Sequence, residues 1–271
     1  MDRRPIGVFD SGLGGLTAVR ELMHRLPAED LIYFGDTSRV PYGSRSPEMI
    51  LKYARQDMNF LCGFDLKAVL IACGTVSTTS LEQLQSEYPV PIIGVVEPAA
   101  KRAVRETRNK KVGLIATKAS VASGAYQRFI ARADADVEVF AEACPLFVPL
   151  VEAGRFRPGD PVIETVAREY LNPVKKAGVD TLVLGCTHYP LLSEVIGNIM
   201  GESVKLISSG GEAAVELARL LEINDALAPE DAVGDISYYV SDAVDGFEQS
   251  AALFLQQDMR GMAQKINIEN Y

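Results

Sequence analysis

Two short apolar runs constrain this chain more than any other feature, because each of them ends in a cysteine. Residues 68–75 are Ala-Val-Leu-Ile-Ala-Cys-Gly-Thr, and residues 181–188 are Thr-Leu-Val-Leu-Gly-Cys-Thr-His. Continuous apolar runs of this length are typical of buried parallel strands. Ligands of parallel sheets bind at the carboxyl ends of the strands. The pattern therefore predicts two thiols, Cys73 and Cys186, at the tips of two such strands.

Strand and helix patterns alternate along the chain, which predicts an α/β fold with mainly parallel sheets. The 271 residues suffice for one large or two ordinary domains of this class. Strands are expected near 5–9, 31–34, 67–72, 92–96, 111–116, 136–140, 180–185, 203–207 and 235–240. Helices are expected near 14–26, 47–62, 78–88, 98–108, 119–132, 161–177, 190–200, 211–222 and 243–257.

The composition limits the partners and the compartment. The net charge of −9 disfavours nucleic acid and an anionic membrane surface as partners. No apolar stretch approaches the ~20 residues of a membrane span, and the N-terminus carries no signal-peptide pattern. Four cysteines are too few for a disulfide scaffold in a chain of this length. We therefore expect a cytoplasmic protein with free thiols.

A weak internal repeat relates the two halves of the chain. Ile6–Ser11 resembles Val112–Thr117, and the two motifs are separated by nearly the same distance as the two cysteine runs. Ser11 and Thr117 both follow a predicted strand and both offer a hydroxyl. Two similar halves facing each other would enclose a cleft, which is a favoured ligand site. Chance similarity is the alternative, since strands that contain glycine are common in α/β proteins.

The two cysteines at the strand tips are candidate catalytic bases. The pKa of a thiol falls at a helix N-terminus, and both cysteines precede predicted helices. Thr75 and Thr187 suit N-cap or first-turn positions, where free N–H groups also bind a carboxylate. A lone cysteine after an apolar run is usually a small core residue, but two in matched frames favour chemistry. Cys62 and Cys144 lack this frame and are expected to be structural.

Two loops are candidates for contacts with a small ligand. Asp10 and Ser11 open a Gly-rich turn that does not fit the dinucleotide fingerprint. Pro41, Tyr42 and Gly43 form a second loop, whose backbone N–H groups could hold an anion. Each loop also has a plainer interpretation, as an ordinary Gly-rich or Pro-x-Gly turn.

Two further side chains are candidates for proton transfer or charge pairing. His188 lies two residues from Cys186, where an imidazole could relay a proton or pair with a thiolate. Glu152 could be a polar group at the edge of a cleft, although a solvated carboxylate is the plainer interpretation. The two histidines and four cysteines have no zinc-type spacing, so no metal is expected.

These residues belong to motifs that follow one another in a characteristic order. The motifs are Ile6–Gly15, Gly35–Thr37, Val40–Gly43, Ala72–Thr75, Gly94–Pro98, Leu150–Glu152 and Leu184–Pro190. In this order they resemble the cofactor-independent glutamate racemases of bacteria, within the aspartate/glutamate racemase superfamily.

The resemblance implies two pseudo-symmetric α/β domains with the active site in the cleft between them. One domain would comprise 1–97 plus 208–271, and the other 98–207. It implies catalytic roles for Cys73, acting on the D-enantiomer, and Cys186, acting on the L-enantiomer, with no cofactor. It implies substrate contacts from Asp10, Ser11, Tyr42, Gly43, Gly74, Thr75, Thr187 and His188, and less directly from Pro41, Thr117 and Glu152.

Two positions depart from the pattern of the family. Many members carry Asn, whose side chain contacts substrate, where this chain has Gly74. Glycine keeps the backbone N–H but loses the side-chain amide. Many relatives also carry Asp where this chain has Ser208–Gly210.

The hypothesis is therefore a racemase that interconverts L- and D-glutamate by a two-base transfer of the α-proton, supplies D-glutamate for peptidoglycan, and forms a homodimer. A racemase of the same superfamily that acts on aspartate or another acidic amino acid is the main alternative. A non-enzymatic amino-acid-binding module is disfavoured by the missing signal peptide and by the paired cysteines. A thiol oxidoreductase is disfavoured because no C-x-x-C occurs.

Overall fold

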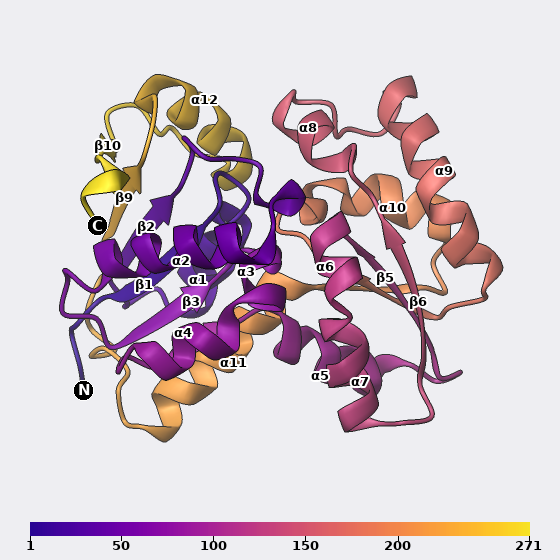
Figure 1. Cartoon of the computed structure of the whole chain (residues 1–271), viewed down its shortest axis with the longest axis horizontal. Coiled ribbons are helices and arrows are strands. Elements are labelled where there is room, and N and C mark those ends of the chain that lie inside the picture. Colours follow the sequence, from indigo (N-terminus) through magenta and orange to yellow (C-terminus); the bar gives the residue numbers. More distant parts are fainter.

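The computed structural model describes residues 1–271 and contains two parallel β-sheets side by side (Figure 1). The six-stranded sheet has the order β10-β9-β2-β1-β3-β4, and the four-stranded sheet has the order β6-β5-β7-β8. All strand pairs are parallel. The strands are β1 (Ile6–Asp10), β2 (Leu31–Gly35), β3 (Ala68–Ile71), β4 (Ile92–Gly94), β5 (Lys111–Ala116), β6 (Glu138–Ala143), β7 (Thr181–Leu184), β8 (Lys205–Ser208), β9 (Ile236–Val240) and β10 (Ala263–Lys265).

The two sheets repeat one topology. The order β2-β1-β3-β4 in the first sheet corresponds strand by strand to β6-β5-β7-β8 in the second. In each sheet the chain crosses to the other side of its first strand after forming the second. This reversal creates a topological switch point between β1 and β3 and another between β5 and β7, where α/β sheets bind ligands. The predicted fold class is confirmed, whereas the residue limits of the two domains stay a prediction.

Helices connect the strands and cover the sheets (Figure 1). Ser46 and Asp160 cap two of the longer helices, each followed directly by a proline, which is the favoured first helical residue. Ser208 caps another helix by accepting a hydrogen bond from the Gly211 N–H at 3.2 Å. The helices are α1 (Leu16–Arg25), α2 (Pro47–Leu61), α3 (Gly74–Thr79), α4 (Leu81–Glu87), α5 (Val96–Glu106), α6 (Lys118–Ser123), α7 (Ala125–Ala133), α8 (Phe147–Glu152), α9 (Pro161–Lys176), α10 (Ser193–Met200), α11 (Ser209–Ile223) and α12 (Val244–Leu255), with short 3-10 turns η1 (Tyr42–Ser44), η2 (Tyr189–Leu192) and η3 (Ile268–Asn270).

Some elements differ from the prediction. The helix expected at 78–88 begins at Gly74 and is interrupted at Ser80, which separates α3 from α4. The helix expected at 119–132 is divided at Gly124, whose φ of 65° is the left-handed conformation that ends a helix. The helix expected at 190–200 begins at Ser193, after the 3-10 turn η2. Strand β10 and helix α8 were not predicted, because each is short and lacks a periodic apolar pattern.

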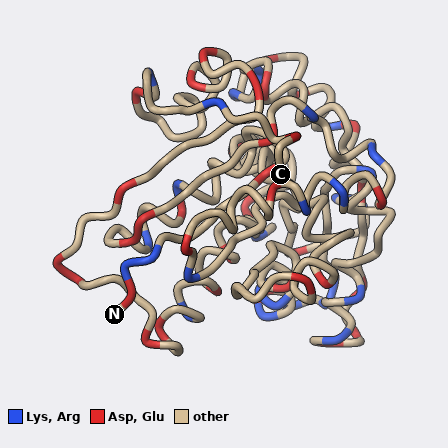
Figure 2. Tube along the Cα trace, turned by 60° about the vertical axis from the view of Figure 1, so that its left-hand side comes forward, with Lys and Arg blue, Asp and Glu red and all other residues tan.

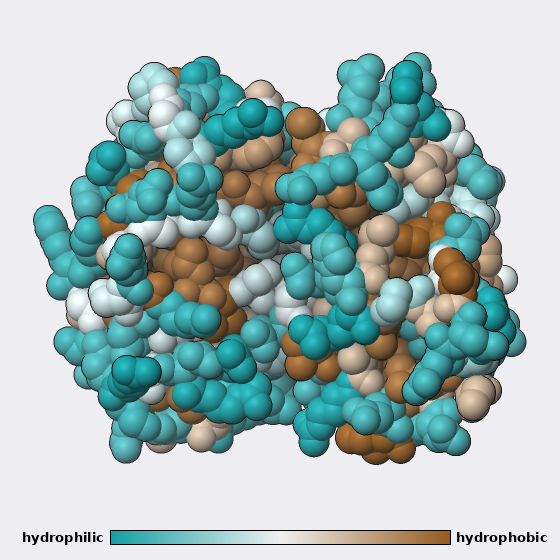
Figure 3. All heavy atoms as spheres, turned by 180° about the vertical axis from the view of Figure 1, so that it is seen from behind, coloured by the Kyte–Doolittle hydropathy of each residue, from teal (hydrophilic) through white to brown (hydrophobic).

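The two ends of the chain lie in the half that holds the six-stranded sheet (Figure 1). Helix α11 returns the chain to this half and packs against both α1 and α5. Lys and Arg residues are interspersed with Asp and Glu along the trace (Figure 2). Hydrophilic side chains cover most of the face seen from behind, with hydrophobic patches between them (Figure 3). None of the helices combines the length and the apolar character needed to cross a membrane.

A buried ion pair between Lys67 and Glu29 stabilises the half of the molecule that holds the six-stranded sheet. Their side chains are 1% and 2% exposed. The Lys67 ammonium also donates to the carbonyl oxygens of Asp2 at 2.7 Å and Ala226 at 2.9 Å. Glu29 accepts a hydrogen bond from the Ala228 N–H at 2.8 Å. The pair therefore joins the N-terminal segment to the connection between α11 and β9.

Lys67→Met should lower the free energy of unfolding by about 3–5 kcal/mol, because it leaves the Glu29 carboxylate buried without a cation. Lys101→Met, which breaks the exposed Glu97–Lys101 pair on α5, should cost no more than about 0.5 kcal/mol. Urea unfolding of both variants measures the difference. Equal losses would contradict the anchoring role of Lys67.

Candidate active site

The loops that follow the four strands of the two switch points meet at one cavity of about 410 Å³. The first half contributes residues after β1 and β3, and the second half contributes residues after β5 and β7. The carboxyl ends of all four strands thus face the same space, as the parallel topology requires. The lining residues from these loops are Ser11, Gly12, Cys73, Gly74, Thr75, Thr117, Lys118, Gly185, Cys186, Thr187 and His188.

The rim of the cavity comes from two further segments. One is the loop Val40–Ser44, and the other comprises Cys144, Pro145 and three residues of α8. Lys118 was missed from the sequence, although it follows Thr117 directly and is the only Lys or Arg in the lining. Cys144 was expected to be structural, but it also lines the cavity. Burial raises the pKa of the Cys144 thiol, so this group stays protonated.

Cys73 is a buried thiol that lies at the N-cap of α3. Its sulfur lies 3.6 Å from Ser11 Oγ. Burial and, next, the nearby Asp10 carboxylate raise the pKa of Cys73 to about 12. The Val76 N–H in the first turn of α3 lowers this pKa, as expected for a helix N-terminus, but burial outweighs it. Helix α3 has only six residues, and its short dipole does not offset the burial.

Cys186 lies in a turn after β7, and Thr187 is not the predicted N-cap, because His188 precedes the 3-10 turn η2 and α10 begins only at Ser193. Its sulfur lies 3.9 Å from His188 Nδ1, and His188 Nε2 lies 3.0 Å from Glu152 Oε1. Burial disfavours the charged imidazole, but hydrogen bonds and charge interactions with Cys186 and Glu152 outweigh it. They raise the pKa of His188 to about 10. The His188 ring thus lies between the Cys186 sulfur and the Glu152 carboxylate.

Asp10 lies behind the cavity and is fully buried. One oxygen accepts a hydrogen bond from the Gly12 N–H at 3.0 Å, and the other accepts one from Thr187 Oγ at 3.5 Å. Burial raises the pKa of Asp10, and the charge of His188 opposes that shift. The carboxylate therefore couples the turn after β1 to the turn that carries Cys186.

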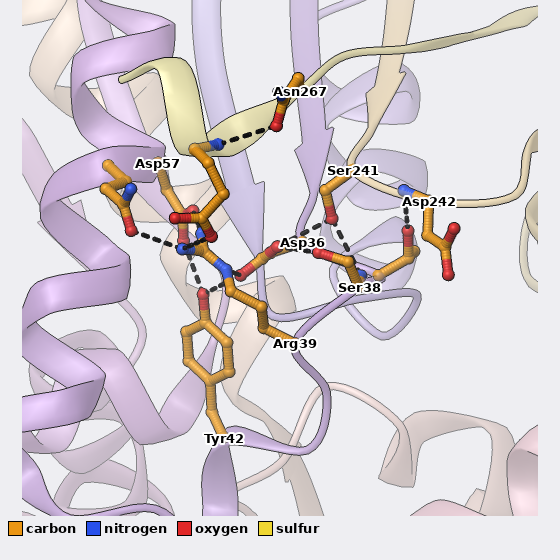
Figure 4. A network of polar contacts seen from close by, with 11 residues as sticks. Asp36, Ser38, Arg39, Tyr42, Asp57, Ser241, Asp242 and Asn267 are labelled. Carbon is orange, nitrogen blue, oxygen red and sulfur yellow. Dashed lines mark hydrogen bonds and ion pairs between the residues drawn. The ribbon is translucent and has the colours of Figure 1, made fainter.

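The remaining predicted residues take different positions. Thr75 is the second residue of α3, and its hydroxyl lies 3.2 Å from that of Thr117 in the other half. Thr117 also caps α6 by accepting from the Ser120 N–H at 3.3 Å. Tyr42 is among the lining residues, and its hydroxyl points toward Asp36 and Asp57 (Figure 4).

Glycines let the two halves approach each other closely. A Cβ at Gly14 would lie 2.1 Å from Thr187 Oγ, and one at Gly43 would lie 3.1 Å from Thr117 Cβ. A Cβ at Gly74 would lie 2.7 Å from the backbone oxygen of Gly185. No side chain fits at position 74 at this spacing.

Comparison with known proteins identifies the family. The family model described as Asp/Glu/Hydantoin racemase matches residues 10–218. The chain belongs to this family. It is 47% identical to a glutamate racemase of Geobacter metallireducens over 94% of each chain. Its structure resembles that of glutamate racemase isoform RacE1 from Bacillus anthracis, with a TM-score of 0.93, 35% identity and 98% of each chain covered. It also resembles a Francisella tularensis glutamate racemase in complex with D-glutamate, with a TM-score of 0.91, 38% identity and 100% of each chain covered.

These comparisons confirm the family and the enzyme class predicted from the sequence, a racemase and therefore an isomerase. The alternative of a non-enzymatic binding module is set aside. The roles of the individual residues at the cavity stay predictions.

Gly74→Ala should lower kcat/KM at least tenfold, because the added Cβ meets a backbone atom and must push the two halves apart. A misplacement of about 1 Å at a reacting centre costs roughly 10²-fold. Gly197→Ala is the control, since nothing lies within 4 Å of a Cβ at this position in α10. Steady-state kinetics measure both variants. Unchanged kinetics in Gly74→Ala would contradict a close contact between the two halves at this position.

Proposed function

We propose that this chain is a glutamate racemase in which Cys73 and Cys186 exchange the α-proton of the substrate on opposite faces of Cα. The observation that carries the proposal is that both thiols line one cavity from the equivalent loops of the two sheets. Further support comes from relatives that carry the name glutamate racemase and from the relative in complex with D-glutamate.

The two thiols have different polar neighbours, Ser11 for Cys73 and His188 for Cys186. With a pKa of about 12, Cys73 holds its proton at neutral pH. The Cys186 sulfur lies 3.9 Å from Nδ1 of His188, whose pKa is raised to about 10. In the proposed reaction Cys186, as thiolate, removes the α-proton of L-glutamate while Cys73 protonates the opposite face. The reverse reaction starts from Cys73 as thiolate and Cys186 as thiol, so each thiol acts on one enantiomer.

The main chemical difficulty is the weak acidity of the α-proton. The site must stabilise carbanion character by electrostatics and by exclusion of water. Backbone N–H groups of Gly74, Thr75 and Thr187 are proposed to hold the α-carboxylate. The Ser11 hydroxyl, with Asp10 behind it, is proposed to orient the ammonium group.

The side-chain carboxylate of the substrate needs a second anion site. The loop Pro41–Gly43 offers backbone groups at the rim, and the Lys118 ammonium adds positive charge to the lining. This arrangement suits an acidic amino acid. Glutamate is the proposed substrate, and aspartate is the alternative.

The biological setting follows from the family resemblance. The proposed role is the supply of D-glutamate for peptidoglycan, and with it for cell-wall biogenesis and cell shape, in the cytoplasm. A homodimer is the proposed assembly, and the reaction is proposed to need no cofactor or metal. The proposal includes neither nucleic acid nor a membrane as partner.

Cys73→Ser and Cys186→Ser should each lower racemisation by about 10²–10⁴-fold or more, because serine is a far poorer base. Circular dichroism in D₂O, without pyridoxal phosphate, measures the rate with L-glutamate and L-aspartate. Mass spectrometry then counts deuterium at Cα. Glutamate should turn over faster and acquire one deuterium.

The matched control is Cys62→Ser, since Cys62 is exposed and lies outside the cavity. Near-normal turnover in either active-site variant would refute the two-thiol reaction. A preference for aspartate would reassign the substrate.

Glu152→Gln should shift the pH dependence of L-glutamate racemisation. The wild type should lose kcat/KM as pH rises through about 10, where His188 loses its proton and with it the positive charge beside Cys186. Removal of the Glu152 charge should move this alkaline limb to lower pH. Glu164→Gln, on the exposed face of α9, is the control. An unshifted limb in Glu152→Gln would exclude His188 as the group responsible.

A further inference from the structure

Tyr42 points its hydroxyl into a buried cluster of charged groups (Figure 4). The hydroxyl contacts Asp36 Oδ2 and lies 3.0 Å from Asp57 Oδ2. Both aspartate side chains are completely buried. A phenol has a single proton to donate. Therefore only one of the two carboxyl groups can accept a hydrogen bond from Tyr42.

Asp36 is the acceptor, because the groups around it donate. Its Oδ2 accepts from Arg39 Nε at 2.6 Å. Its Oδ1 accepts from Ser241 Oγ at 2.8 Å, and Ser241 Oγ in turn accepts from the Ser38 N–H at 2.9 Å. The Ser241 hydroxyl therefore donates its proton to Asp36. This set of donors suits an ionised carboxylate, which can only accept.

Asp57, in contrast, lacks a donor for one of its two oxygens. Its Oδ1 accepts from Arg39 Nη2 at 3.0 Å, and its Oδ2 faces the Tyr42 oxygen, whose proton is taken. Two oxygens at hydrogen-bond distance require a proton between them. We propose that Asp57 keeps its own proton at neutral pH and donates it to Tyr42, and that this chain of hydrogen bonds positions the loop Val40–Ser44 at the rim of the active site.

The charges that face Asp57 agree with this protonation state. Burial raises the pKa of Asp57 well above its ordinary value, and the Asp36 carboxylate adds to the shift while Arg39 opposes it. The buried cluster then holds one cation and one anion. The other titratable groups close to Asp57 or to Arg39 are Asp10, Tyr42, Tyr53, Tyr88 and Glu269.

Arg39 is held firmly enough to serve both aspartates. Its Nη1 donates to Gln56 Oε1 at 2.5 Å and lies 3.6 Å from Glu269 Oε1 in η3. Its guanidinium also lies 4.3 Å from the centre of the Tyr53 ring, within the range of a cation–π interaction. The cluster is therefore a rigid support for Tyr42.

The support matters because Tyr42 begins the turn η1 in the rim loop. Its neighbour Gly43 packs against Thr117 of the other half. Asp57 does not line the cavity, so it is a positioning residue that acts through Tyr42. This inference rests on the proposed function, in which the rim loop holds the side-chain carboxylate.

Two isosteric variants test the proposal. In Asp57→Asn the amide reproduces the protonated acid, since its oxygen accepts from Arg39 and its NH₂ donates to Tyr42. In Asp36→Asn the amide NH₂, which can only donate, must face a group that also donates, so one hydrogen bond is lost. Asp57→Asn should keep KM and kcat for L-glutamate within about twofold, whereas Asp36→Asn should raise KM at least tenfold. Hydrogen exchange of residues 40–44 should accelerate only in Asp36→Asn.

The proton itself has two further readouts. The infrared difference spectrum between wild type and Asp57→Asn should contain the carbonyl stretch of a protonated carboxyl group in the wild type. Because the folded wild type holds a proton that the unfolded chain releases above the ordinary pKa of Asp, its stability should fall as pH rises from that value toward the raised pKa. Asp57→Asn should lack this decline.

Equal KM losses in the two variants, accelerated exchange in Asp57→Asn, or a missing infrared band would overturn the proposal. Infrared spectra, hydrogen exchange and unfolding do not depend on turnover. A chain that failed to racemise glutamate would refute the proposed function, while these three measurements would still decide the state of Asp57 and the anchoring of the loop.

Discussion

The close approach of two backbones at the carboxyl ends of the sheets is the constraint on which the site depends. Gly74 faces the backbone oxygen of Gly185, and Gly14 faces Thr187 and His188, at distances that exclude a Cβ. Parallel topology brings the loops to this edge, but only glycine lets them meet closely enough to bury both thiols. The same closeness raises the pKa of Cys73, because it withdraws the thiol from water. The close approach of the two halves therefore determines both the shape of the site and the raised pKa of Cys73.

The two halves share a topology but not an electrostatic environment. Burial and the Asp10 carboxylate raise the pKa of Cys73, whereas hydrogen bonds with Ser11 lower it. Cys186 has the imidazole of His188, whose charge depends on Glu152 on the other side of the ring. A symmetric fold thus carries two thiols in different surroundings, one beside a hydroxyl and a buried carboxylate and the other beside a histidine.

Much of this arrangement could be predicted from the sequence, because apolar runs identify buried strands and parallel strands end at a common edge. The β10 strand was not predicted, since its three residues are largely polar and pair only through the position of β9. The turn after Cys186 was taken for a helix start, because the local pattern does not distinguish a 3-10 turn from a first helical turn. The direction of the Tyr42 hydroxyl was equally out of reach. It depends on Asp57, which α2 brings close only after folding.

The strands that have no counterpart in the second sheet help to position the loop Val40–Ser44 at the rim of the cavity. The first sheet has two strands, β9 and β10, that have no counterpart in the second sheet. Ser241 follows β9 and Glu269 follows β10, and both reach the segment that precedes the rim loop, at Asp36 and Arg39. In the second half the corresponding side of the cavity is formed by α8, which carries Glu152. One half therefore stabilises a backbone loop through a buried cluster, and the other half supplies a carboxylate to the histidine. The C-terminal segment, although distant in sequence from either cysteine, belongs to the structure that holds the site in shape.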